Sequence, residues 1–239
     1  MKPLAIDLYA GLGGWAEGFL ANNYTVIGFD IERHDYGTGG YPGHLVLQDV
    51  REIHGRRFNN ATVIVASPPC TEYAYMAMPW SRGKQVQSAL LGIDDFPDNY
   101  HGSRTIKQLN ILFNECFRIR REASEAAGRC IPLVIENVRG AEKWVGRAKR
   151  HYGPQYLWGD IPLRVPAAPV NYRKGEGSGR SWFYQNSGNG RSASSHSKER
   201  KMWTAKVSKI PFALANWIAG SYYPKNSVMI ETGKVVIVE

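Results

Sequence analysis

Cysteine and long apolar runs are both scarce in this chain of 239 residues. The 3 cysteines are scattered without paired spacing, which favours neither a disulfide framework nor a zinc cluster and fits a reducing compartment. No stretch approaches the length of a membrane span, and residues 1 to 15 lack the charged and apolar regions of a secretion signal. The sequence therefore predicts a cytoplasmic protein without a metal site or a membrane contact.

Positive charge is abundant, and it is concentrated in one segment. Residues 139 to 206 hold 14 Lys and Arg against 4 Asp and Glu, a net of +10, whereas the rest of the chain has 16 against 17, a net of −1. A solvated basic surface is one explanation. Because aromatic side chains are interleaved with this charge, we favour a partner that is a polyanion with bases available for stacking, namely nucleic acid. The aromatic residues are Tyr152, Tyr156, Trp158, Tyr172, Trp182, Phe183 and Tyr184.

Five short apolar runs alternate with helical patterns along the first two thirds of the chain. They are rich in β-branched residues, as expected for strands that are buried on both faces of a parallel sheet. The runs occupy residues 3 to 9, 24 to 30, 44 to 49, 62 to 67 and 132 to 137. This pattern predicts an α/β fold with a doubly wound, mostly parallel sheet and helices on both sides.

Helical spacing of apolar residues predicts a long helix within residues 103 to 128, ended by Gly128. Cys116 lies on the apolar side of this helix, and Cys130 directly precedes the fifth apolar run. Because unpaired cysteine is commonly buried and behaves as a small hydrophobic residue, we expect both to belong to the core. Cys70 is the remaining cysteine and needs a different explanation.

The pattern weakens after about Tyr152, where Gly, Ser, Asn and positive charge predict long loops. A helix is expected in residues 210 to 220, with Pro211 in its first turn, and a hairpin around Thr232 and Gly233. We therefore expect a catalytic and cofactor-binding domain in residues 1 to 150. A small basic recognition insertion would occupy residues 151 to 206, and residues 207 to 239 would return to the catalytic domain.

Glycines and acidic residues follow the first three runs. Gly11, Gly13 and Gly14 come directly after the first run, where a tight turn allows the backbone to approach a ligand. Asp30 and Asp49 end the next two, and strand ends of a doubly wound sheet share one crevice. We expect Asp30 to accept hydrogen bonds from ribose hydroxyls and Asp49 from an adenine amine. For each aspartate alone, a helix cap or a turn is the alternative.

Cys70 ends the sequence SPPC, at the same edge of the predicted sheet. Pro68 and Pro69 restrict the backbone that presents its thiol, and a thiol at a strand end that faces a crevice is a candidate nucleophile. Glu136 and Asn137 end the fifth run. A thiol facing a carboxylate across the crevice indicates covalent chemistry on an electrophilic ring.

These motifs together resemble the cytosine carbon-5 DNA methyltransferase family, of which the chain would be a short member, phage-like or orphan. The similar segments, in chain order, are DLYAGLGGW, FDIE, QDV, SPPC and ENV, and more weakly HYGPQ and IPFALANWIAG. The resemblance implies a Rossmann-like fold, S-adenosylmethionine as the methyl donor, and double-stranded DNA with a flipped-out base as the substrate. It also implies cofactor contacts at further positions, which are Asp7, Tyr9, Ile31, Val50 and Pro68.

The implied mechanism assigns catalytic roles to three residues. Cys70 adds to carbon 6 of cytosine so that carbon 5 becomes nucleophilic. Glu136 holds or donates a proton at ring nitrogen 3, and Asn137 fixes the loop that carries Cys70. In the basic segment, we expect Arg173, Lys174 and Arg180 to contact nucleic acid.

The chain departs from the family pattern at several places. The family has Gln-x-Phe-Ser after its proline-cysteine pair, where this chain has TEYA at residues 71 to 74. An arginine pair that helps to hold the base is replaced by YLW at residues 156 to 158, and a Gly-Asn pair by Val207 and Ser208. The recognition region is also short. We expect the loop over the base to differ and sequence recognition to be minimal.

Three other functions remain open. An RNA-directed member of the same family fits the doubled proline and the short recognition region, and no sequence feature separates it from a DNA enzyme. Enzymes that methylate an exocyclic amine carry an aromatic residue after Asp/Ser-Pro-Pro, and Cys70 in that place and the segment ENV both argue against this function. A binding protein without catalysis would fit the missing arginines, although Cys70 and Glu136 are both present.

Overall fold

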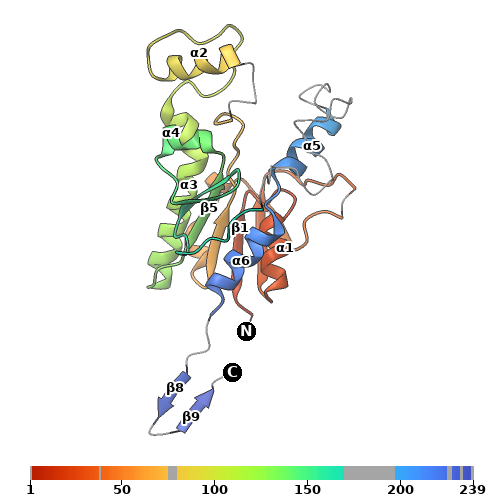
Figure 1. Cartoon of the computed structure of the whole chain (residues 1–239), viewed down its shortest axis with the longest axis vertical. Helices are drawn as coiled ribbons and strands as arrows, with labels where there is room; N and C mark the ends of the chain where they lie inside the picture. Colours follow the sequence, from red (N-terminus) through yellow and green to blue (C-terminus); the bar gives the residue numbers. More distant parts are fainter. Residues whose placement is uncertain are drawn as a thin grey trace.

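The computed structural model describes residues 2–37, 39–74, 80–169, 197–224, 228–231 and 234–237. A seven-stranded sheet in the order β3-β2-β1-β4-β5-β7-β6 forms its centre (Figure 1). The five predicted strands are confirmed as β1 (Leu4–Leu8), β2 (Thr25–Asp30), β3 (His44–Leu47), β4 (Val63–Ala66) and β5 (Leu133–Asn137). All neighbouring pairs among these five are parallel. The predicted fold class, α/β with a mostly parallel sheet and helices on both faces, is therefore confirmed.

Two further strands were not predicted. β6 (Arg150–Tyr152) and β7 (Gln155–Gly159) form an antiparallel hairpin, and β7 pairs with β5. HYGPQ spans the turn of this hairpin. The sheet thus continues through Gly159, into the range expected for the recognition insertion, and the predicted division into domains stays a prediction.

One face of the sheet is covered by two helices that touch each other (Figure 1). α1 (Gly14–Ala21) and α6 (Phe212–Tyr222) pack there against the apolar side chains of β1, β2, β4 and β5. α6 confirms the predicted helix, although Pro211 is its N-cap and lies just outside it. We call this side of the sheet the α1–α6 face.

The opposite side, the α3 face, is covered by α3 (Ile106–Ala127). Thr105 caps its first turn by accepting a hydrogen bond from Gln108, and Gly128 ends it in the left-handed conformation, φ 62°, as predicted. Cys116 is fully buried in the core, which confirms its expected place. Cys130 is exposed, and the prediction was wrong there, because the turn after Gly128 runs along the surface, where Arg120 donates to its sulfur over 3.1 Å.

The other elements are short or stand apart from the sheet. They are η1 (Val50–Glu52), η2 (Gly55–Phe58), η4 (Arg139–Ala141), α2 (Trp80–Leu90), α4 (Glu142–Val145) and α5 (Lys198–Ser208). The predicted hairpin is present as β8 (Val228–Glu231) and β9 (Lys234–Ile237), and Figure 1 shows it well away from the sheet. Thr232 and Gly233 lie outside the described residues.

Candidate functional site

The carboxyl ends of β1, β2, β4 and β5 meet at one edge of the sheet because these strands run parallel. Side chains alternate between the two faces along each strand. Asp7, Asp30 and Glu136 share the face of Ala5, Val26 and Val134, which pack under α1 and α6. Three buried carboxyl groups therefore point to the α1–α6 face at or near this edge.

The turn after β1 is built from glycines that contact other segments closely. Gly11 has φ 49° and donates its N–H to Asp30 Oδ2 over 2.9 Å, which joins the turn to the end of β2. Gly13, φ 73°, is the N-cap of α1, and a Cβ there would lie 2.3 Å from Cδ of Pro42. A Cβ on Gly14 would lie 2.5 Å from the backbone nitrogen of Ile210. The glycine run thus permits both the turn and the close approach of neighbouring segments.

Asp30 is a strongly hydrogen-bonded carboxylate. Besides Gly11, it accepts from the N–H of Glu32 over 3.1 Å and lies 3.4 Å from Nε2 of His34. Burial alone would raise the pKa of Asp30, but the hydrogen bonds from His34 and from the two backbone N–H groups lower it. The same contact with Asp30 raises the pKa of His34 above 6.5. Asp30 is therefore ionised at neutral pH, as an acceptor of hydroxyl groups should be.

Asp7 lies deeper and is fully buried. Its Oδ2 accepts from the hydroxyl of Tyr41 over 3.0 Å, whereas Oδ1 has no hydrogen-bond partner among the described residues. Burial raises the pKa of Asp7 well above 3.8, and the nearby Asp30 raises it further, against the opposite effect of Tyr41. The Tyr41 ring lies against Gly28, where a Cβ would be 2.4 Å from Cζ. An unpartnered buried oxygen beside the glycine turn is suited to accept a donor from a ligand.

The other residues predicted to hold the cofactor have different environments. Ile31 is 74% exposed beside Asp30, so its side chain is accessible, whereas Val50 is buried in the core. Tyr9 adopts φ 61°, unusual for a residue with a side chain, and donates its hydroxyl to the carbonyl of Leu112 over 2.8 Å. Asp49 caps η1 and forms an ion pair with Arg51. The carboxylate of Asp49 is thus a helix cap in this structure, and its contact with adenine stays a prediction.

Cys70 is partly exposed on the loop that follows β4. Its carbonyl oxygen accepts from the N–H groups of Tyr73 and Ala74 over 3.0 and 2.9 Å, which closes a tight turn after the thiol. Before it, Ser67 accepts a hydrogen bond from the indole N–H of Trp15 over 3.0 Å. Both ends of the SPPC sequence are therefore held by hydrogen bonds.

The end of β5 contacts the same loop. Asn137 is buried and donates its side-chain N–H to the carbonyl of Pro68 over 2.9 Å, while its oxygen accepts from Val138. This is the contact with the loop that the sequence analysis expected of Asn137. Glu136 is 4% exposed and precedes it on the opposite face. The structure thus brings the segments of Cys70 and Glu136 together at one edge of the sheet.

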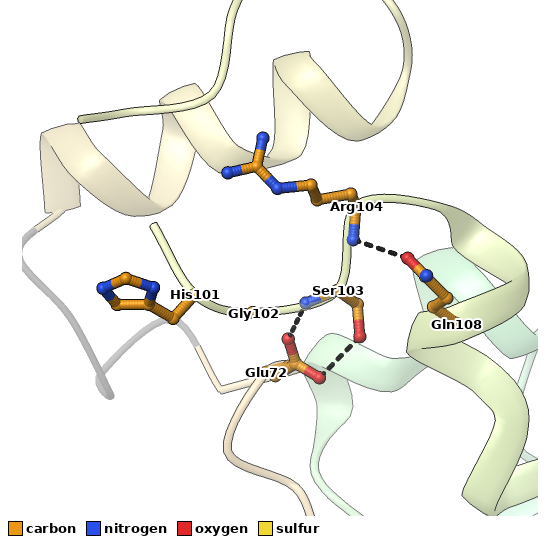
Figure 2. Close-up of a pocket in the computed structure, with 6 residues that line it drawn as sticks. All are labelled: Glu72, His101, Gly102, Ser103, Arg104 and Gln108. Carbon is orange, nitrogen blue, oxygen red and sulfur yellow. Dashed lines mark hydrogen bonds between the residues drawn. The ribbon is translucent and has the colours of Figure 1, made fainter. Parts of the chain in front are cut away.

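Sequence reasoning did not identify Trp15, Tyr41 or Glu72 as parts of this region. Glu72 accepts hydrogen bonds from the backbone N–H and the hydroxyl of Ser103 over 2.6 and 2.8 Å, as Figure 2 shows. These contacts line a hollow of about 500 Å³ whose rim includes Arg104. The hydrogen-bond partners of all three side chains are remote in the chain, so the sequence did not indicate these contacts. The sequence showed only that Glu72 lies where this chain departs from the pattern of the resembled family.

The positions at which the resembled family has an arginine pair lie in β7. Leu157 and Trp158 are buried, and the indole of Trp158 donates to the carbonyl of Gly146 over 2.9 Å. Tyr156 pairs with Asn137 in the sheet and stacks on His151 at a centroid distance of 5.2 Å. Leu157 and Trp158 therefore serve the core, and the aromatic ring of Tyr156 is next to the end of β5.

The basic segment is described only in part. Arg173, Lys174 and Arg180 lie outside the described residues, so their predicted contacts with nucleic acid stay predictions. α5 is described, and it contacts the segment that follows β2 through an ion pair of 3.2 Å between Lys201 and Glu32. Within the described ranges, no group of three or more His, Cys, Asp or Glu side chains is arranged to hold a metal ion. No described helix is long and apolar enough to cross a membrane.

Comparison with known proteins gives partial structural likenesses. A prophage-encoded E. coli protein described as a DNA modification methyltransferase is 22% identical to this chain, with a TM-score of 0.38. The alignment covers 61% of this chain and 35% of that protein. A DNMT2 mutant of Spodoptera frugiperda is 17% identical, with 59% and 37% covered and a TM-score of 0.34. Dnmt2 of S. pombe is 16% identical, with 59% and 36% covered and a TM-score of 0.34.

The chain thus aligns with little more than a third of the length of each of these proteins. No protein-family model matches it, and no curated protein does. The function of this chain is therefore inferred from its own residues and contacts.

Proposed function

We propose that this protein transfers a methyl group from S-adenosylmethionine to carbon 5 of cytosine in DNA, through a covalent adduct with Cys70. The observation that carries the proposal is the 2.9 Å hydrogen bond from Asn137 to the carbonyl of Pro68. It joins the loop of the thiol to the strand of the carboxyl group, Glu136, at the edge where the glycine turn binds Asp30. These contacts support a site in which the nucleophile, the acid and the cofactor turn work at one edge of the sheet, as covalent methylation of a ring requires.

The residues at this edge fit S-adenosylmethionine. The Asp30 carboxylate is ionised, and among the described residues its Oδ2 accepts a hydrogen bond only from Gly11. Oδ2 can therefore accept a second hydrogen bond, which suits a ribose hydroxyl. The exposed side chain of Ile31 offers an apolar surface for adenine. The unpartnered Oδ1 of Asp7 suits the ammonium group of the methionine part. When bound, this cofactor supplies an electrophilic methyl group on a sulfonium.

The chain's own residues then carry the ring chemistry. The thiolate of Cys70 forms a bond to carbon 6 of cytosine, and the electron pair of the carbon 5–carbon 6 bond moves into the ring as Glu136 donates a proton to nitrogen 3. Carbon 5, now nucleophilic, would form a bond to the methyl group as the methyl–sulfur bond breaks, and the electron pair of that bond would stay on sulfur as a neutral thioether. Loss of the carbon-5 proton to a base re-forms the double bond, and the bond from carbon 6 to sulfur breaks. The Cys70 thiolate is restored, and nitrogen 3 returns its proton to Glu136.

A mechanism-based trap tests the proposal directly. Duplex DNA carrying 5-fluorocytosine should be methylated once and then stay attached to Cys70, because fluorine does not leave as the carbon-5 proton does. The adduct should survive denaturation and be visible by mass spectrometry of the intact protein. Cys70→Ser should abolish it, because a hydroxyl ionises far less than a thiol near neutral pH.

Cys116→Ser and Cys130→Ser provide the matched controls, and both should keep forming the adduct. Methylation of DNA without any adduct would move the reaction to an exocyclic amine and refute the role of Cys70. A trapped complex with fluorinated RNA, together with no activity on DNA, would make the protein an RNA methyltransferase.

The basic segment supports nucleic acid as the substrate, and salt titration tests this part. If residues 139 to 206 contact phosphates, the logarithm of the affinity for duplex DNA should fall linearly with the logarithm of salt concentration, because bound counterions are released. Replacing Arg173 and Lys174 together by alanine should reduce the slope by about 2 if each contacts one phosphate. The affinity for S-adenosylmethionine should not change. Binding that is independent of salt would contradict this assignment.

A further inference from the structure

One short stretch of α3 contacts the loops that follow three different strands. Its Leu112 carbonyl accepts from Tyr9, after β1. The hydroxyl of Tyr73, after β4, lies 3.0 Å from the carbonyl of Leu109 and 3.0 Å from Oδ1 of Asn110. These loops carry residues proposed above for the cofactor and for the nucleophile. The middle of α3 therefore connects separate parts of the site.

Asn110 extends this connection to a third loop. Its side-chain N–H donates to the carbonyl of Trp144 over 2.8 Å, in α4, which follows β5 and Glu136. Because a carbonyl only accepts, the amide of Asn110 must turn its nitrogen to Trp144 and its oxygen to Tyr73. The amide thus has one preferred orientation, in which it accepts from one loop and donates to the other.

Burial makes these contacts costly to lose. Tyr73 is 4% exposed and Asn110 is 8% exposed, so water cannot easily replace either partner. Tyr73 stands where the resembled family has phenylalanine, and only a hydroxyl makes this contact with Asn110. The N–H of Tyr73 also donates to the carbonyl of Cys70 over 3.0 Å. The backbone of Tyr73 therefore contacts the proposed nucleophile, while its side chain contacts Asn110.

We propose that Tyr73 and Asn110 are positioning residues that hold Cys70 in register with Glu136 through the chain Tyr73–Asn110–Trp144, here called the polar bridge. Asn137 joins the loop of Cys70 to the segment of Glu136 on the N-terminal side of Cys70, at Pro68. The polar bridge joins the same loop and segment on the C-terminal side of Cys70, at Tyr73. Because Tyr73 and Asn110 are both buried, we expect them to act through Cys70 and Glu136 and not by contact with the substrate. The inference rests on the proposed function, because it concerns the geometry of the thiol relative to the acid.

The test compares two variants that each remove one buried tyrosine hydroxyl. Tyr73→Phe breaks the bridge. Tyr24→Phe is the matched control, because Tyr24 is 2% exposed and donates to a helix carbonyl, that of Ala219 over 3.1 Å, on the α1–α6 face. Tyr73→Phe should slow adduct formation with 5-fluorocytosine DNA about 10- to 100-fold, the effect of a small misplacement of reacting groups. Its affinity for S-adenosylmethionine should be that of the parent, and Tyr24→Phe should keep the parent rate.

Asn110→Leu should slow adduct formation similarly, and the double variant with Tyr73→Phe should be no slower than the slower single variant, since both remove one unit. Amide hydrogen exchange gives a second readout that needs no activity. The backbone amides at positions 73 and 74 should exchange at least about tenfold faster in Tyr73→Phe than in Tyr24→Phe, because the loop opens more readily.

The inference fails if Tyr73→Phe forms the adduct at the parent rate, or if Tyr24→Phe loses as much. If the parent protein never forms the adduct, the proposed function fails instead. In that case, amide hydrogen exchange alone tests whether the polar bridge holds the loop. Faster exchange in Tyr73→Phe would support the polar bridge, and unchanged exchange would overturn it.

Discussion

The two faces of the sheet carry different kinds of buried polar group. On the α1–α6 face lie three carboxyl groups, those of Asp7, Asp30 and Glu136. On the α3 face, the buried polar side chains that contact the site loops are the neutral amides of Asn110 and Asn137. The buried carboxyl groups thus lie on one face, and the two amides that contact the loops of Cys70 and Glu136 lie on the other. The comparison indicates that the sheet separates the proposed acid from these amides.

The helices that cover these faces also differ. α1 packs on α6 through glycine, since a Cβ on Gly18 would lie 2.4 Å from the backbone of Ala215. α3 is a single helix of 22 residues that buries one side and leaves the other in solvent. The contact between α1 and α6 is therefore made by closely approaching backbones. The α3 face instead offers helix carbonyls and side chains to the loops above it.

The sharpest test of the comparison is Glu136→Gln, on the α1–α6 face. If this carboxyl group donates a proton at nitrogen 3, its loss should slow adduct formation by about 100-fold or more. Calorimetry should show unchanged affinity for S-adenosylmethionine, because the substituted group does not hold the cofactor. A variant as fast as the parent would remove the chemical role of this face.

Close helix packing on the α1–α6 face is tested by Gly18→Ala. The new methyl group has no room against the backbone of Ala215, so the free energy of unfolding should fall by about 2 kcal/mol. The melting temperature should fall by about 4–8 °C. Gly220→Ala, on α6, is the control: its Cβ would meet only Asn22 Oδ1, at an ordinary 3.5 Å, so stability should rise by about 0.5–1 kcal/mol. Equal effects of the two changes would contradict the packing argument.

Asp30→Ala tests whether the acid at the end of β2 binds the cofactor. Loss of hydrogen bonds to a charged group should weaken S-adenosylmethionine binding by about 1.5–3 kcal/mol, roughly 10- to 100-fold, measured by calorimetry. Asp35→Ala is the control on the same segment, because Asp35 accepts from Gly37 on the exposed turn. If Asp30→Ala binds S-adenosylmethionine as tightly as the parent, Asp30 does not bind the ribose. That result would concern Asp30 alone and not the proposed role of the glycine turn.

The smallest expected effect concerns pH. Asp30 raises the pKa of His34 above 6.5 in the folded protein. The stabilisation from this contact should therefore be complete below pH 6.5 and be lost as the pH rises through the raised pKa of His34. The difference in unfolding free energy between the parent and His34→Gln should be below about 1 kcal/mol and larger at pH 6 than at pH 9. In an Asp30→Ala background this pH dependence should disappear.

Local patterns were sufficient to predict much of the fold. Runs of β-branched residues identified the five parallel strands, and helical spacing with Gly128 identified α3, because both depend on burial along one element. β6 and β7 were missed because both segments are short and mix polar with aromatic residues, which gives no clear strand pattern. They form strands because they pair with each other and β7 pairs with β5. Cys130 was misplaced for a similar reason: the sequence does not show that the turn before β5 runs along the surface.

The sequence by itself determined which chemical groups are present and at which strand ends they lie: Cys70, Glu136 and the glycine turn with Asp30. This is possible because parallel strands bring their carboxyl ends to one edge whatever the details of packing. Only the tertiary structure decided which groups hold them. Tyr73 reaches Asn110, and Asn137 reaches Pro68 across 69 positions of the chain, because separate elements fold against one another. Contacts between remote residues depend on the packing of whole elements, and no local pattern encodes that packing.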